Sequence, residues 1–258
     1  MIKFFRKIRQ KLLSEDKPAL PAGRFSKYLI YAVGEIILVV IGILIALQVN
    51  NWNEQQKVNH LERNYLERIS QDLVSDSLYL IRRIKESTAL IKSGKDFPLK
   101  AYKTQKSFDE YMNLINSLSW NSEHFVVQKS TFDELNNSGN FNILSNPKLK
   151  NTILKHYLKY ETDASHIKEM NEFSQITLEK IITILFKGWN TVDVNSELNI
   201  DTKMDWKYIN DPASKKFIDM ETAVRGYTGK HETFNSYFKE SLIRIRLLLK
   251  EIDVELNK

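Results

Sequence analysis

Residues 28–52 read YLIYAVGEIILVVIGILIALQVNNW, and Glu35 is the only charged side chain among them. The apolar part, residues 28–49, would form a helix roughly 33 Å long at about 1.5 Å per residue. That length is sufficient to cross a hydrocarbon core about 30 Å thick. The stretch therefore predicts a transmembrane helix over residues 28–49.

Aromatic side chains flank this segment, with Tyr28 and Tyr31 at one end and Trp52 at the other. Tyrosine and tryptophan favour the two membrane–water interfaces, so these three residues are the predicted interface anchors. A buried core helix is the alternative interpretation. It is disfavoured because soluble core helices are seldom apolar on every side for six turns.

The basic charge of the chain lies before this segment. Residues 1–27 hold eight Lys or Arg against two acidic side chains, which accounts for the whole formal net charge of +6. The positive-inside rule then predicts a cytoplasmic tail over residues 1–27 and a periplasmic domain over residues 50–258. We expect an uncleaved signal anchor, with a single pass through a bacterial inner membrane.

The predicted partner of the tail is the lipid bilayer. A nucleic-acid-binding protein would carry its basic charge on a folded face, so no nucleic acid is expected. The tail is either a short amphipathic helix on the inner leaflet or an unstructured positive segment. The predicted inner-leaflet basic patch consists of Lys3, Arg6, Lys7, Arg9 and Lys11.

One face of the predicted span combines the glutamate with small residues. The side chains at this face recur at steps of three and four residues, which is a heptad pattern typical of a coiled-coil seam. A small-xxx-small pair such as Gly42 and Ala46 lets two membrane helices approach closely. The predicted association seam is Ala32, Glu35, Val39, Gly42 and Ala46.

This seam predicts a homo-oligomer or a complex with another membrane protein, because an ionisable group inside a span normally faces protein or water. Two alternatives stay open. Glu35 could be a proton-relay carboxylate, or it could reach water at the inner interface and have no special role.

Eight glycines and five prolines are few for 258 residues, which favours helices over a turn-rich β fold. We predict an all-α fold in which one N-terminal transmembrane helix continues into an elongated extracytoplasmic bundle of three long and two short helices. The first long helix is expected to end near Ser93, at the sequence SGKDFP. Its apolar face is predicted to contain Leu61, Tyr65, Ile69, Leu73, Leu80, Ile84 and Ile91.

Local signals mark the other helices. Capping boxes predict short helices at Ser107 with Glu110 and at Thr131 with Glu134, the second ending in a left-handed cap at residues 138–139. Asn-Pro at 146–147 and Asp-Pro at 211–212 predict the starts of two long helices. Between them, residues 187–210 read as a polar loop. The predicted apolar faces are Leu149, Ile153, Tyr157, Tyr160, Ala164, Ile167 and Met170 in one long helix, and Phe217, Met220, Val224, Tyr227, Phe234, Phe238, Ile245, Leu249, Ile252 and Leu256 in the other.

The sequence shows no pattern of known chemistry. It lacks cysteine, glycine-rich nucleotide-binding motifs and a G-x-S-x-G nucleophile motif. Among five histidines, His156 and His166 lie ten residues apart near one helical face, a spacing too weak to predict a metal site. We therefore expect no catalytic, cofactor-binding or metal-binding residues, and no enzyme activity.

Two stretches resemble a known family. Residues 1–13, MIKFFRKIRQKLL, and residues 25–54, FSKYLIYAVGEIILVVIGILIALQVNNWNE, resemble the N-terminus of uncharacterised single-span proteins common in Bacteroidota. Residues 130–157, STFDELNNSGNFNILSNPKLKNTILKHY, resemble a second recurrent block of the same family. The resemblance implies an inner-membrane protein with a periplasmic helical domain, includes Glu35 in the family's pattern, and implies no activity.

The sequence thus favours a non-enzymatic, membrane-anchored periplasmic helical scaffold that self-associates or binds a partner through its span. Two alternatives are kept. The periplasmic bundle could be a sensory or regulatory module that binds a ligand or partner. The chain could also be an accessory subunit of a proton-driven inner-membrane complex that uses Glu35.

Overall fold

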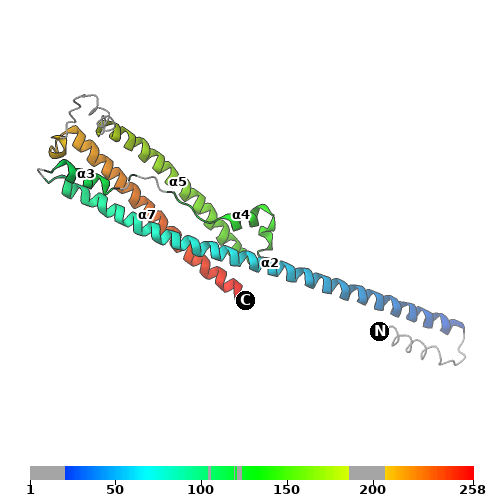
Figure 1. Cartoon of the computed structure of the whole chain (residues 1–258). Coiled ribbons are helices and arrows are strands. Elements are labelled where there is room, and N and C mark those ends of the chain that lie inside the picture. Colours follow the sequence, from blue (N-terminus) through cyan, green and yellow to red (C-terminus); the bar gives the residue numbers. More distant parts are fainter. Residues whose placement is uncertain (1–20, 104–105, 119, 121–123, 186–206) are drawn as a thin grey trace, which may run out of the picture. The chain divides into compact units, whose positions relative to one another are not determined.

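The computed structural model describes residues 21–103, 106–118, 120, 124–185 and 207–258, and within these ranges the chain contains helices and no strand. Three α-helices are long and two are short, which confirms the predicted all-α fold (Figure 1). The elements are α2 (Pro21–Ala101), α3 (Phe108–Asn116), α4 (Ser130–Asn137), the 3-10 turn η1 (Asn140–Ile143), α5 (Pro147–Leu185), the 3-10 turn η3 (Lys207–Asn210) and α7 (Lys215–Leu256).

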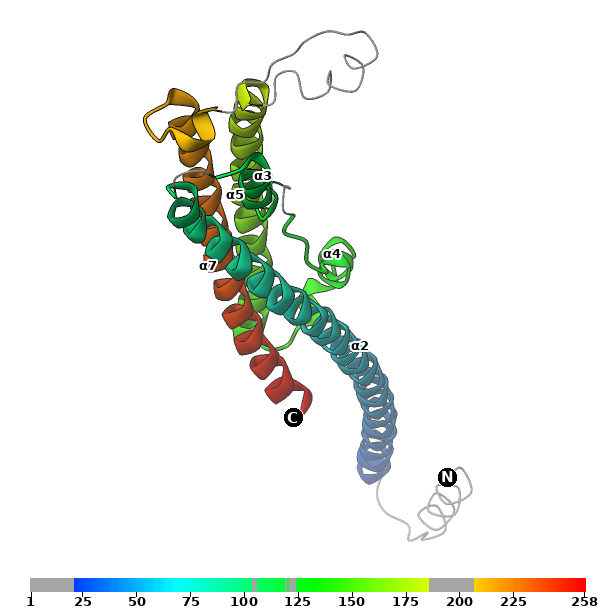
Figure 2. The ribbon, with the colours of Figure 1, turned by 60° about the vertical axis from the view of Figure 1, so that its left-hand side comes forward.

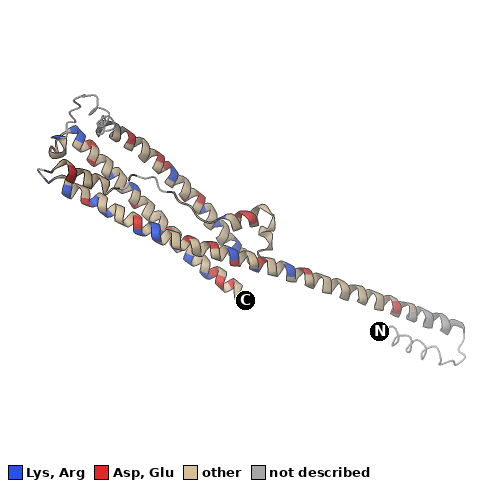
Figure 3. Ribbon diagram, in the orientation of Figure 1, with Lys and Arg blue, Asp and Glu red and all other residues tan. Residues whose placement is uncertain are grey.

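The chain divides into two compact units, residues 1–60 and 61–258. In the first unit, the described part of α2 contains one stretch long and apolar enough to cross a membrane. No charged side chain lies between Glu35 and Glu54, which is visible as an uncoloured stretch of α2 in Figure 3. Its large apolar side chains are exposed, which leaves this segment a candidate membrane span.

The second unit is a bundle with one main apolar core. In α2 the fully buried side chains include Leu66, Ile69, Leu73 and Leu80, and steps of three, four and seven residues place them on one helical face. The other long helices contribute Ile153, Tyr157, Ile167, Phe234, Phe238 and Ile245. Figures 1 and 2 show α5 and α7 side by side within this unit. The predicted apolar faces are thus buried or partly buried, except for Leu61, which is 38% exposed.

A second, smaller core forms where α2 ends and α7 begins. Phe97 of α2 meets Tyr111 of α3, with ring centroids 6.4 Å apart, and Tyr111 meets Tyr208 of η3 at 6.0 Å. Phe217 and Met220 of α7 are buried in the same cluster. The short elements α3 and η3 therefore cover an apolar surface that the long helices leave open.

The first long helix does not end near Ser93, as the sequence predicts, but continues to Ala101 with Gly94 and Pro98 inside it. Tertiary contacts explain the difference, because Phe97 and Ala101 are buried in the second core. Pro98 lies in the last turn, where its missing N–H removes at most one helical hydrogen bond. At the other end, the helix already begins at Pro21, within the predicted tail.

Two predicted helix starts are also wrong. Thr131 lies inside α4, which begins after Lys129 without a side-chain cap, and it is buried because it faces the core. The last helix begins after Ser214, whose hydroxyl accepts a hydrogen bond from the Phe217 N–H. Asp211 instead stabilises the preceding turn by accepting from the Ala213 N–H.

The remaining local signals are confirmed. Ser107 and Glu110 form a reciprocal capping box at α3. Gly139 has a φ of 75°, the left-handed conformation that glycine adopts without steric cost. The helix that starts at Pro147 ends at Leu185. Of the predicted loop, residues 187–206 lie outside the described residues, and residues 207–210 form η3.

Close packing of α2 on α7 generates a first prediction. A Cβ atom at Gly94 would lie 2.1 Å from Thr228 Oγ1 and 3.1 Å from its Cβ. Thr228 is buried, and its hydroxyl donates to the Val224 carbonyl, so it cannot easily move aside. We expect Gly94→Ala to lower the free energy of unfolding by about 1–3 kcal/mol, measured by chemical denaturation of the full chain.

Gly229→Ala is the matched control, since a Cβ at this position of α7 would meet no atom within 4 Å. It should leave stability unchanged or raise it by up to about 1 kcal/mol through helix propensity. Equal effects of the two substitutions would contradict the close contact.

Candidate functional site

The predicted association seam lies on the exposed surface of α2. Ala32, Glu35, Val39, Gly42 and Ala46 are all exposed. A Cβ at Gly42 would meet no atom within 4 Å among the residues that the structure describes.

The predicted membrane anchors are only partly visible. Trp52 is 63% exposed on α2. Tyr28 and Tyr31 belong to the same helix, but their side chains lie outside the described part of the chain. The basic patch from Lys3 to Lys11 also lies outside the described residues.

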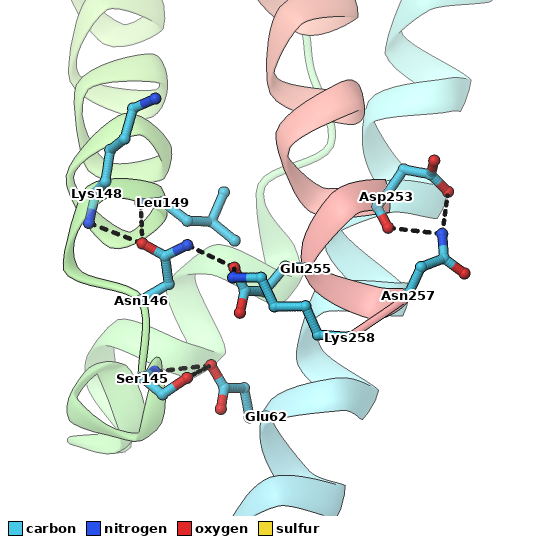
Figure 4. A network of polar contacts seen from close by, with 9 residues as sticks. All are labelled: Glu62, Ser145, Asn146, Lys148, Leu149, Asp253, Glu255, Asn257 and Lys258. Carbon is cyan, nitrogen blue, oxygen red and sulfur yellow. Dashed lines mark hydrogen bonds and ion pairs between the residues drawn. The ribbon is translucent and has the colours of Figure 1, made fainter.

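In the second unit, polar contacts join the beginning of the bundle part of α2 to the start of α5 and the end of α7; we call these contacts the polar clamp (Figure 4). The Glu62 Oε1 atom accepts hydrogen bonds from the Ser145 N–H at 2.7 Å and from its hydroxyl at 3.0 Å. Asn146 caps α5 by accepting from the Lys148 and Leu149 N–H groups. Its amide nitrogen donates to Glu255 of α7.

The clamp continues at the next residue of α2. Arg63 donates to the Leu256 carbonyl at 2.8 Å, where it binds a backbone oxygen of the last turn of α7. Cations are favoured at helix C-termini because the unpaired carbonyls carry partial negative charge. The clamp therefore joins three helix segments that are 83 to 193 residues apart in sequence.

Glu134 extends the contacts between α2 and α4. Its carboxylate accepts from both Arg68 amino groups and from the Tyr65 hydroxyl. The Arg68 guanidinium, followed by the Tyr65 hydroxyl, holds the pKa of Glu134 below its ordinary value. The sequence predicts that Glu134 forms a capping box within α4, whereas in the structure its carboxylate binds side chains of α2.

Residues 124–129, which we call the strap, lead into α4 and are held by three side chains of the long helices. The Tyr79 hydroxyl donates to the His124 carbonyl at 2.6 Å. Tyr160 donates to the Phe125 carbonyl at 2.8 Å and accepts from the Val127 N–H at 3.1 Å. Asp76 accepts from the Gln128 N–H at 2.9 Å. These contacts pair backbone groups of an irregular segment that crosses the bundle surface.

A buried ionic cluster joins α5 to α7. The Asp163 side chain is fully buried and contacts Lys159 at 2.6 Å and Arg244 at 2.7 Å. His156 is buried nearby, with no hydrogen-bond partner for either ring nitrogen among the described residues. Burial, together with the positive charge of Arg244, lowers the pKa of His156 to about 4, so the imidazole is neutral at pH 7.

The two histidines considered from sequence do not form a common site. His156 lies in the core, whereas His166 is at the surface, with its Nδ1 atom 3.3 Å from the Tyr237 hydroxyl. No group of three or more His, Cys, Asp or Glu side chains that could hold a metal ion occurs among the described residues. The arrangement that the structure does show is one of helix-to-helix polar contacts.

Sequence reasoning missed the clamp and the strap contacts. One signal was present, since Asp76 falls between Leu73 and Leu80 on the apolar face of α2. An acidic residue at a core position indicates a buried polar contact, because burial without a partner is costly. No comparable local pattern marks Glu62 or Ser145.

Comparison with known proteins gives one match. The model of a family of unknown function (DUF6090) matches residues 35–203. No curated protein and no solved structure matches the chain. The matched region includes Glu35, most of α2, α3, α4 and α5.

The clamp generates a second prediction. Glu62→Ala removes the acceptor of the Ser145 N–H and hydroxyl, and we expect the free energy of unfolding to fall by about 1–2 kcal/mol. Glu62→Gln keeps one carbonyl oxygen and should lose less than half of that amount. Urea titration of both variants is the measurement, and equal losses would contradict the hydrogen-bond explanation.

The buried imidazole generates a third prediction. The unfolded chain binds a proton at His156 near the ordinary pKa of about 6.5, whereas the folded chain does so only near pH 4. Its burial therefore costs stability as pH falls through this window. We expect His156→Leu to gain on the order of 1–3 kcal/mol relative to wild type between pH 7 and pH 4.5. If wild type and His156→Leu showed parallel pH profiles of unfolding free energy, the lowered pKa of His156 would be contradicted.

Proposed function

The chain belongs to the DUF6090 family of unknown function, and we propose that it is a non-enzymatic, membrane-anchored helical scaffold that assembles through its span. In this proposal residues 28–49 cross a bacterial inner membrane. Residues 1–27 lie in the cytoplasm, and residues 50–258 form a periplasmic domain. The partner is a second copy of the chain or another membrane protein.

The exposed seam on α2 is the observation that carries the proposal. Gly42 and Ala46 lie on the same surface as Glu35, and the space around Gly42 is open. In lipid, helices associate through close backbone packing and interhelical hydrogen bonds, because the hydrophobic effect does not drive contacts between apolar helices. A second helix on this face would supply both kinds of contact.

Glu35 adds a reason for association. Among the described residues, none provides this carboxyl group with a hydrogen bond or ion pair. A carboxyl group inside a bilayer is costly unless it finds a polar partner or water. A helix packed on the seam could donate a hydrogen bond to Glu35 and relieve that cost.

The folded part of the chain fits a role in holding helices. Its buried polar side chains contact other helices of the bundle. Glu62 and Arg63 join α2 to the ends of α5 and α7, and Asp163 joins α5 to α7. These contacts specify one arrangement of the long helices, as a scaffold requires.

Glu35 also supports a second candidate, an accessory subunit of a proton-driven complex. A proton relay needs a group that ionises, whereas an assembly contact needs only a hydrogen-bonding side chain of similar shape. Glu35→Gln separates the two, because glutamine retains the shape and hydrogen bonding but cannot exchange a proton.

The fourth prediction concerns the seam. The full-length protein in mild detergent should show a native mass above that of one chain, alone or with a stoichiometric partner. Gly42→Ile should shift it to a monomer, because the added side chain separates the helices. Leu44→Phe is the control, since Leu44 lies about 200° around the helix from Gly42, so the added bulk falls away from the seam and should leave the mass unchanged.

Under the scaffold proposal, Glu35→Gln keeps the native mass and the co-purifying partner. A wild-type protein that is monomeric and has no partner would contradict the proposal, as would a native mass that Gly42→Ile does not change. An assembly that persists in Glu35→Gln while a proton flux of the isolated complex disappears would favour the proton-driven alternative.

A further inference from the structure

Two carboxyl groups lie one helical turn apart on α2, beneath the strap. Asp76 is 1% exposed, and one of its oxygens accepts from the Gln128 N–H at 2.9 Å. Its other oxygen, Oδ2, is buried and has no hydrogen-bond partner among the described residues. The Oδ2 atom of Asp72 is buried in the same way. A buried carboxylate oxygen without a donor is among the costlier groups in a folded protein.

The charged groups around this pair do not neutralise it. At the end of the strap, Lys129 pairs with Asp133 of α4 at 3.5 Å and with Glu161 of α5 at 2.9 Å. On α2, Arg68 pairs with Glu134, and on α7, Arg244 pairs with Asp163. The nearby cations therefore have other carboxylates as partners.

The other titratable side chains that interact with this pair or with the strap are tyrosines. Tyr157 of α5 interacts electrostatically with both Asp72 and Asp76, and its buried hydroxyl has no hydrogen-bond partner among the described residues. The hydroxyls of Tyr160 and of Tyr79 on α2 are already used by the strap backbone. Tyr160 donates to the Phe125 carbonyl, and Tyr79 donates to the His124 carbonyl. A proton on one carboxyl oxygen would turn an unpaired acceptor into a donor close to these oxygen atoms.

We propose that Asp76, with Asp72 one turn away, forms a proton-operated latch: a proton on the buried Asp76 carboxyl group keeps the strap closed, and its loss to solvent favours opening. In the closed form, Asp76 still accepts from the Gln128 N–H while its protonated oxygen donates within the pair or to Tyr157. In the open form, the Asp76 carboxylate is hydrated. This role lies beyond the proposed scaffold function and does not depend on it.

The electrostatics support a transition near neutral pH. Burial, and then the negative charge of Asp72, raise the pKa of Asp76 to about 7, although the Gln128 N–H opposes this shift. When the strap opens, the carboxyl group returns towards its ordinary pKa of about 3.9. Between about pH 3.9 and pH 7 the closed form therefore holds more protons than the open form, so the closed form loses stability as pH rises. Above about pH 7 both forms are deprotonated, and the stability of the closed form no longer changes with pH.

Opening of the strap would have consequences for the core. Phe125 and Val127 are buried in the main core, where the Phe125 ring lies 4.9 Å from Tyr160 and 5.6 Å from Phe238. The strap also leads directly into α4, which carries the Glu134 contact to α2. The pair is thus placed to couple proton concentration to the surface formed by the strap and α4.

The fifth prediction uses hydrogen exchange of the full-length protein in detergent, read by mass spectrometry on peptides that contain Gln128. A local readout is needed because the buried His156 imidazole gives global stability the opposite pH dependence over an overlapping range. In wild type, protection of the strap should fall by about tenfold per pH unit between roughly pH 5 and 7. Asp76→Asn mimics the protonated side chain, so its strap should be better protected at pH 7 and insensitive to pH.

Comparison at equal pH removes the intrinsic pH dependence of exchange. Asp109→Asn, an exposed aspartate of α3, is the control and should retain the wild-type profile. Asp72→Asn should move the decline to lower pH. The proposal is overturned by a pH-independent wild-type strap, by an equal decline in Asp76→Asn, or by an unchanged profile in Asp72→Asn. Protection restored by sodium, potassium or calcium ions at fixed pH would overturn it in favour of a bound cation.

Discussion

The bundle depends on the burial of three apolar helix faces against one another. Each long helix carries one such face, and none can cover it alone. At about 25 cal/mol per Å² of apolar surface removed from water, side chains such as Tyr157, Phe234 and Phe238 supply the main favourable term. The close approach of α2 to α7 at Gly94 follows from this requirement, because only a residue without a side chain fits against Thr228.

Polar contacts then fix the arrangement that apolar burial leaves undetermined. Apolar faces tolerate sliding and rotation, whereas buried polar groups need particular partners. Glu62 with Ser145 and Asp163 with Arg244 each satisfy a buried carboxylate that would otherwise be costly, and the exposed Arg63 adds a contact to the last turn of α7. The Glu62 and Arg63 contacts lie near the start of α5, whereas Asp163 lies near its middle, so a shift of one long helix would break contacts at both levels.

Not every buried polar group is satisfied, and the exceptions are informative. His156 and Asp76 both have buried atoms without a hydrogen-bond partner among the described residues, and burial pushes each towards its neutral form. For the histidine the neutral form is the unprotonated one, whereas for the aspartate it is the protonated one. The two groups therefore respond to acid in opposite directions, and the strap next to Asp76 is the part of the surface where a proton could change local structure.

The sequence by itself determined the helical class, the candidate span, and the caps whose partners lie within four residues, such as Ser107 with Glu110 and Asn146 with the start of α5. Heptad spacing alone places Glu35, Gly42 and Ala46 on one face. Tertiary structure decided that α2 continues through Gly94 and Pro98, that Glu134 binds α2, and that Asp76 holds the strap. The physical reason is range: caps and periodicity are set by near neighbours in sequence, whereas these outcomes depend on side chains 52 to 134 residues away, which only the folded chain brings into contact.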